Sequence, residues 1–155
     1  MLIMVLAAAA MPAAVLWQNV TVGMNSADVQ KAQPSAVVSS KPETLKSGAA
    51  CDLVIPAFEV ASDDYRVCFF FKDKRLEQVM LSSVKEPTEP QFRSIVTALR
   101  SKYGKEINFE KNILGYDVDW FTSDKVNVSL TYFNKYGSLL NINYQVRLAK
   151  DAKGL

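Results

Sequence analysis

The stretch Lys125-Val-Asn-Val-Ser-Leu-Thr-Tyr-Phe133 decides the fold, because apolar and polar residues alternate along most of it. Its even-numbered positions are all apolar, and its odd-numbered positions from Asn127 to Thr131 are all polar. A period of two is that of a β-strand with one buried face and one solvated face. The same alternation returns in residues 139–148, so we expect antiparallel strands with one wet face.

Strand signals of this kind occur in two sets of three along the chain. Each run contains β-branched or aromatic residues, and turn-forming residues separate the runs. The first set covers 52–60, 65–71 and 76–84, and the second covers 115–121, 125–133 and 139–148.

A long amphipathic helix is predicted between the two sets. Thr88 and Gln91 have the spacing of a capping box. Apolar residues follow from Phe92 at intervals of three and four, which is the period of a helix with one buried face. Gly104 ends the pattern.

Helices are also predicted before the first set of strands. Asn25 or Ser26 caps a short helix, and Pro34 stops it. Ser40 and Glu43 again have capping-box spacing, which predicts a second short helix near 41–46.

Together these signals predict an α+β fold made of two tandem helix-plus-three-strand units, about 17–85 and 86–150. We expect one domain over 17–150, with an antiparallel sheet and helices packed on one of its faces. Residues 151–155 are polar and are expected to form a flexible tail.

Composition excludes several functional classes. The chain has 155 residues and a formal net charge of +2, and its basic residues are scattered among acids, so no nucleic-acid-binding stripe is indicated. It has no histidine and two cysteines. Ser/His/Asp or Cys/His catalysis and a thiolate zinc site therefore cannot be assembled. We expect a protein that is not an enzyme and that carries no cofactor and no metal.

The amino-terminal residues 1–16 are apolar and uncharged. Ala8 and Ala10 have the spacing of a signal-peptide cleavage site, although the cationic start of such a peptide is missing. A membrane anchor and a buried first element of the fold are the alternatives, and an uncleaved segment is the one expected route to membrane contact. A cleaved signal predicts a periplasmic or secreted protein.

Export bears on the two cysteines, Cys51 and Cys68, because disulfides persist in oxidising compartments. Both lie on strands expected to be neighbours. A tight hairpin through 62–64 does not set them opposite each other, so they can pair only if the first strand is bulged or bent. Two buried free thiols are the alternative.

Two kinds of candidate site emerge. Asp117 and Asp119 share one face of a strand and could serve as acid and base or hold a hard cation. The stronger candidate is the polar face of the last two strands, where amide side chains surround one aromatic ring, as in protein-binding surfaces. Its residues are Asn127, Thr131, Phe133, Asn141, Asn143 and Arg147.

Three segments carry a family resemblance. Val22-Gly-Met-Asn-Ser-Ala-Asp-Val29 resembles the helix opening of the beta-lactamase-inhibitor-like group and of the small outer-membrane-assembly lipoproteins. Residues 69–79 look like the hairpin that follows in such domains, and Leu99–Lys105 resembles a helix end found in exported bacterial proteins. The resemblance implies an exported binding or scaffolding domain. The chain lacks both the lipidated cysteine and an inhibitory loop, so neither group's partner is carried over.

We therefore expect an exported, non-catalytic protein-binding or inhibitory module of a bacterial envelope, with a protein partner. A small periplasmic enzyme or cation-binding protein using Asp117 and Asp119 is the first alternative. An envelope assembly or scaffold component is the second.

Overall fold

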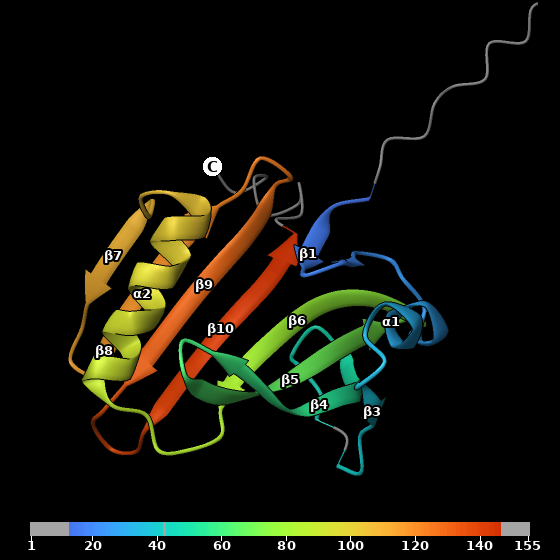
Figure 1. Cartoon of the computed structure of the whole chain (residues 1–155), viewed down its shortest axis with the longest axis horizontal. Helices are drawn as coiled ribbons and strands as arrows, with labels where there is room; N and C mark the ends of the chain where they lie inside the picture. The colour runs from blue at the N-terminus through green and yellow to red at the C-terminus, as the bar shows by residue number, and fades with distance from the viewer. Residues whose placement is uncertain (1–12, 42, 147–155) are drawn as a thin grey trace, which may run out of the picture.

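The computed structural model describes residues 13–41 and 43–146, and within them strands dominate (Figure 1). The helices are α1 (Ser26–Ala32) and α2 (Glu89–Tyr103), and a small hairpin joins β1 (Val15–Trp17) to β2 (Val20–Thr21). The main sheet of the described residues has eight antiparallel strands. Their order is β3 (Val37–Val38), β4 (Ala50–Val60), β5 (Asp63–Lys72), β6 (Arg75–Ser83), β10 (Leu139–Val146), β9 (Val126–Phe133), β8 (Gly115–Phe121) and β7 (Asn108–Lys111).

The predicted α+β architecture of two helix-plus-three-strand units, 17–85 and 86–150, is wrong. The described residues form mostly antiparallel strands, with two helices. Strand β6 pairs directly with β10, from Asn141 opposite Ser82 to Gln145 opposite Gln78. This pairing joins both sets of strands into one continuous sheet, which β3 and β7 extend at its two edges.

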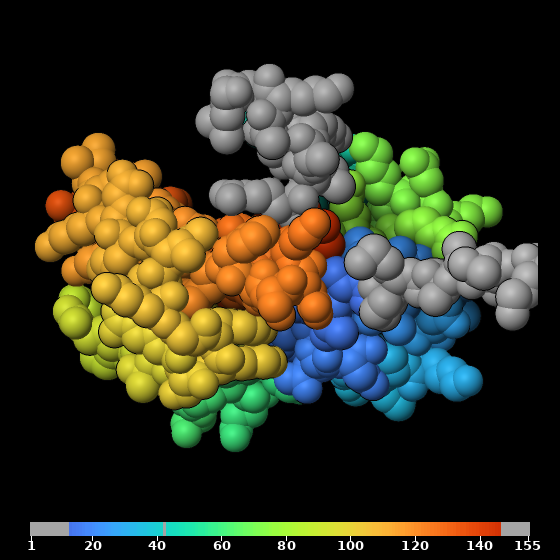
Figure 2. Space-filling view, turned by 90° about the horizontal axis from the view of Figure 1, so that it is seen from above, coloured from blue at the N-terminus to red at the C-terminus, as the bar shows by residue number. Residues whose placement is uncertain are grey.

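The first unit also lacks a helix large enough to cover it. Helix α1 has seven residues, and Val29 is its one buried residue. The β1–β2 hairpin takes over this role: Leu16, Trp17 and Val20 are at most 3% exposed and join the main core. Figure 2 shows this hairpin (blue) beside the segment that connects β8 to β9 (orange).

The predicted short helix at 41–46 is also wrong for the residues that the structure describes there. The backbone N–H of Leu45 donates to the carbonyl of Ala49 at 2.8 Å, and the N–H of Cys51 donates to the carbonyl of Glu43 at 2.8 Å. The segment therefore folds back on the start of β4 as an irregular hairpin. Gly48, at φ +90°, occupies the left-handed region that its turn needs.

The expected long helix is confirmed as α2. Thr88 caps it by accepting a hydrogen bond from the Gln91 N–H, and Gly104 ends it. The side chain of Gln91 does not complete the capping box. It lies 8% exposed and donates to the Tyr65 hydroxyl at 2.9 Å and to the Ser83 hydroxyl at 3.1 Å, so it ties the start of α2 to the sheet.

Helix α2 packs across β8 and β9 on one face of the sheet (Figure 1). The ring of Phe92 stacks on Tyr116 at 4.8 Å and on Tyr132 at 5.3 Å between centroids. The predicted alternation of β9 is confirmed, since its even-numbered residues are buried and its odd-numbered residues are half-buried. Burying one such aromatic side chain contributes about 1.5 to 3 kcal/mol.

A smaller core lies on the opposite face of β4 and β5, and it contains a disulfide between Cys51 and Cys68, whose Cα atoms are 5.8 Å apart. The bulges that this pairing required are present in β4, between Cys51 and Leu53 and between Ile55 and Phe58. Leu45 packs against this cluster, so the 43–49 segment covers this half of the second face.

Candidate functional site

The predicted binding surface lies on the sheet face opposite α2, beside the half that the 43–49 segment covers. We call the outward side chains of β6 to β10, on the sheet side opposite α2, the open face. The cross-strand register places Asn127 opposite Gln145, Ser129 opposite Asn143, and Thr131 opposite Asn141. The predicted residues Asn127, Thr131, Phe133, Asn141 and Asn143 therefore share the open face, and all are half-buried. Arg147 lies outside the described residues.

Hydrogen bonds between neighbouring strands organise much of the open face. Asp117 accepts from Thr131 Oγ1 at 2.9 Å and from Asn112 Nδ2 at 2.9 Å. Asp119 accepts from Ser129 Oγ at 2.6 Å and from Asn108 Nδ2 at 3.1 Å. Both carboxylates are thus engaged with hydroxyl and amide donors of β7, β9 and the β7–β8 turn.

These carboxylates were the candidate acid–base pair or cation ligands. Among the residues described, no three His, Cys, Asp or Glu side chains are grouped so that they could hold a metal ion. The two hydrogen bonds that each carboxylate accepts make Asp117 and Asp119 members of the polar network of the open face.

A side-chain hydrogen bond also connects the two halves of the sheet. Gln78 Nε2 on β6 donates to Asn143 Oδ1 on β10 at 2.9 Å. Asn127 Nδ2 donates to Ser129 Oγ at 2.7 Å, which extends the network from Asp119 along β9. Most polar side chains of the open face therefore have a protein partner.

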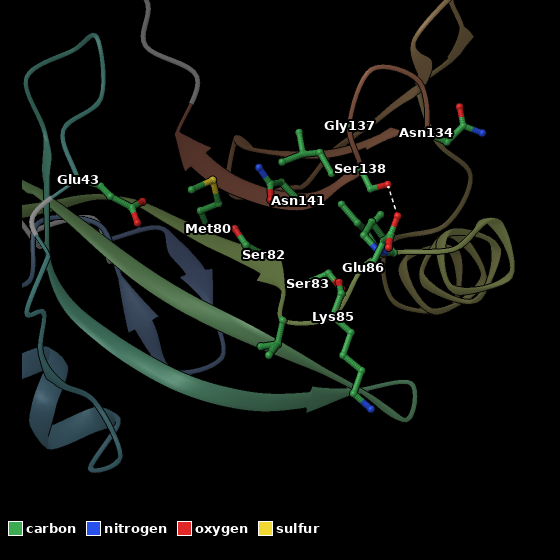
Figure 3. A pocket seen from close by; sticks show the side chains of 14 residues that line it. Glu43, Met80, Ser82, Ser83, Lys85, Glu86, Asn134, Gly137, Ser138 and Asn141 are labelled. Atoms are coloured by element: carbon green, nitrogen blue, oxygen red, sulfur yellow. Dashed lines mark hydrogen bonds between the residues drawn. The ribbon is translucent and has the colours of Figure 1, made fainter.

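A central groove of about 830 Å³ opens on this face, above the β6–β10 junction (Figure 3). We define it by its floor, formed by Met80, Ser82 and Asn141, and by its walls. One wall comes from residues 83–87, which lead from β6 into α2, and from residues 134–138, which join β9 to β10; Glu43 lies at the opposite side.

Hydrogen bonds to the first turn of α2 hold this wall in place. Ser83 accepts from Gln91 and donates to the Lys85 carbonyl at 2.8 Å. Gln91 also donates to Tyr65, and burial raises the pKa of the Tyr65 hydroxyl to about 12, so this phenol stays neutral. Within this wall, Ser138 Oγ donates to Glu86 at 3.1 Å and links the two segments that form it.

Asn141 is the exception in this polar network. In the described part of the chain, its Oδ1 is the one buried side-chain oxygen or nitrogen that lacks a hydrogen-bond partner. Buried acceptors are nearly always paired, so an unpaired one needs a reason. The oxygen is shielded from solvent within the floor of the groove.

The sequence identified the strand residues of this surface but missed the groove. Ser82 and Ser83 carry no motif, and Glu86 and Ser138 lie in turns 52 residues apart. Their proximity depends on the pairing of β6 with β10, which no local pattern reports.

Neither helix in the described ranges is long and apolar enough to cross a membrane. The chain matches no protein-family model, no curated protein and no solved structure.

Proposed function

We propose that this protein is an exported, non-catalytic protein-binding or inhibitory module of a bacterial envelope, which acts through the open face and its central groove. The observation that carries the proposal is the central groove, which opens on a sheet face of half-buried amides and hydroxyls.

The surroundings of Asn141 support a macromolecular partner. The groove is broad, and it continues into a half-buried surface of amides and hydroxyls with the ring of Phe133 among them. Protein interfaces combine such polar groups with aromatic anchors. The apolar amino-terminal segment and the Cys51–Cys68 disulfide support export.

The enzyme or cation-binding alternative rests on Asp117 and Asp119. Each of these carboxylates already accepts two hydrogen bonds from neighbouring strands or turns. This engagement favours a role in holding the open face over one in acid–base chemistry or cation binding. The scaffold alternative uses the same surface and differs in the identity of the partner.

The test is affinity capture from a bacterial envelope extract with the chain immobilised, followed by calorimetry with each purified partner. Ser138→Arg places a bulky cation at the groove wall, and Ser94→Arg makes the same change on the exposed side of α2. We expect the wild type and Ser94→Arg to bind one common protein that Ser138→Arg fails to bind. Recovery of no protein above background, or equal binding by all three, contradicts the proposal.

A further inference from the structure

We infer that two copies of this chain associate through β7, edge to edge and antiparallel, so that their main sheets become one. The inference goes beyond the proposed function and does not rest on it. Strand β7 lies at the edge of the sheet, whereas the central groove lies above the β6–β10 junction. The basis is an open strand edge with exposed apolar side chains, for which one two-fold register sets no like charges opposite each other.

Strand β7 offers free backbone hydrogen-bonding groups. It is the last strand of the sheet, beside α2, and each of its residues is exposed (Figure 1). The N–H of Asn112 donates to the Gly115 carbonyl at 2.9 Å, which makes these two a hydrogen-bonded pair. Such pairs alternate along an antiparallel ladder, so Phe109 and Lys111 direct their N–H and carbonyl groups away from β8. An added strand can pair with these groups.

Apolar side chains are exposed at the same edge. Ile107, which precedes β7, is 59% exposed, and Phe109 is 45% exposed. The ring of Phe109 lies on the α2 side of the sheet, 6.3 Å from that of Phe92. A pocket of about 340 Å³ opens there, and Phe92, Val96 and Phe109 form its apolar lining. Covering this surface with apolar groups of a second copy favours association.

The charged side chains around this pocket have partners within the chain. Arg93 forms an ion pair with Glu89 at 2.7 Å, and Arg100 forms one with Glu106 at 2.6 Å. The ammonium of Lys111 lies 5.7 Å from the ring centroid of a neighbouring tyrosine. These cations do not call for an acidic occupant, and the pocket suits an uncharged, apolar group.

The charges of β7 select one two-fold register. If the outward residues pair with each other, the register is centred on Phe109, Glu110 or Lys111. The second choice sets two carboxylates directly opposite each other and the third sets two ammonium groups, and both arrangements are destabilising. The register centred on Phe109 sets its two rings opposite each other and places Glu110 opposite Asn108 of the second copy. The amide of Asn108 can donate to that carboxylate.

Association through β7 would double the open face. Residues that lie opposite each other in an antiparallel pair share one face of the sheet, so the open faces of both copies lie on the same side. A binding partner that spans both copies is then held at two points. One short strand per copy makes an interface smaller than the about 1,200 Å² of stable complexes, so we expect a weak dimer.

Sedimentation equilibrium of the full chain with its disulfide intact measures this dimer. We expect the average mass to rise from that of a monomer towards that of a dimer between about 10 µM and about 1 mM, as for a small interface. Amide exchange followed by NMR locates the contact. The outward N–H of Phe109 should exchange more slowly at the high concentration, because it gains a hydrogen bond.

Three variants each add one lysine and differ only in its position. Phe109→Lys sets two ammonium groups opposite each other, and we expect it to raise the dimer dissociation constant about tenfold. Asn108→Lys sets an ammonium opposite Glu110 of the second copy, twice in each dimer, and should lower the constant about fivefold. Val38→Lys adds the same charge to β3 at the opposite edge of the sheet, where Val38 is 75% exposed, and should leave the constant unchanged.

The pattern across these variants decides the inference. No rise in mass with concentration, an Asn108→Lys dimer no tighter than the wild type, or equal effects of Phe109→Lys and Val38→Lys overturn it. Because one variant is expected to tighten the dimer, misfolding of another cannot produce the expected pattern.

The experiment also separates this inference from the proposed function. If the chain stays monomeric while a captured protein slows exchange of the Phe109 amide, the edge receives a strand of another protein and the second-copy inference fails. If the dimer forms but no envelope extract yields a partner, the dimer stands and the proposed protein-binding function fails.

Discussion

Replacing Asn141 with leucine is expected to raise the free energy of unfolding, although it changes the centre of the candidate site. Leucine has nearly the shape of asparagine but carries no acceptor, so the substitution removes the buried oxygen that has no partner. The matched control is Asn143→Leu, two residues along the same strand and on the same face. Asn143 Oδ1 accepts from Gln78 Nε2 at 2.9 Å, so its loss should be destabilising.

The two changes should have opposite signs and similar sizes. An unsatisfied buried acceptor costs about 1 to 3 kcal/mol, and because Asn141 is half-buried we take the lower end, about 1 kcal/mol of stabilisation. Loss of the Asn143 hydrogen bond leaves the Gln78 donor unpaired and costs about 1 kcal/mol. The two variants should therefore differ by roughly 2 kcal/mol.

Urea unfolding followed by tryptophan fluorescence measures this difference. Trp17 and Trp120 are 3% and 1% exposed, so unfolding moves both indoles into water. With a urea dependence of about 2 kcal/mol per molar, Asn141→Leu should raise the midpoint by about 0.5 M and Asn143→Leu should lower it by about 0.5 M.

One result would refute the reasoning. If Asn141→Leu lowers the midpoint as much as Asn143→Leu does, the Asn141 oxygen has a partner within the folded chain. The oxygen is then not an unpaired buried acceptor. If Asn141→Leu raises the midpoint but no longer binds the captured partner, Asn141 lowers the stability of the fold and is needed for binding.

Three further predictions concern the fold. Gly115→Ala should lower the free energy of unfolding by about 2 kcal/mol or more in urea titrations, because the added methyl group overlaps a backbone carbonyl of β9. Reducing the disulfide between Cys51 and Cys68, which are 17 residues apart, should cost about 3 kcal/mol, measured as the urea midpoint with and without reductant. Hydrogen bonds from Arg100 lower the pKa of Glu106 to about 2, so the stability they add is complete above pH 4.5 and is lost as the pH falls towards 2. Glu106→Gln should flatten that part of the stability–pH curve.

The sequence was reliable wherever a feature depends on a local period. The alternation in β9 and the helical spacing that starts at Phe92 each report one buried face, and the structure buries those faces. The shared face of Asn127, Thr131, Asn141 and Asn143 follows from the same period of two, because paired antiparallel strands keep their faces in common.

The prediction failed where a long-range contact decides the outcome. Two sets of three strands on either side of a helix suggested two units, but the period of a strand does not reveal which strand lies beside it. Ser40 and Glu43 have the spacing of a capping box, yet the segment after them folds back on β4 because Leu45 packs with the buried cluster around the disulfide. Tertiary packing overrides weak local propensity in such short segments.

The pairing of β6 with β10 explains both the wrong architecture and the missed groove. It sets Ser82 opposite Asn141 and makes one sheet of the two sets of strands. The same pairing brings the turn after β6 against the turn before β10, where Ser138 donates to Glu86 across the groove wall. Two separate units would leave Asn141 at a sheet edge, where water could reach its oxygen. The unpaired acceptor is therefore a consequence of joining the two halves.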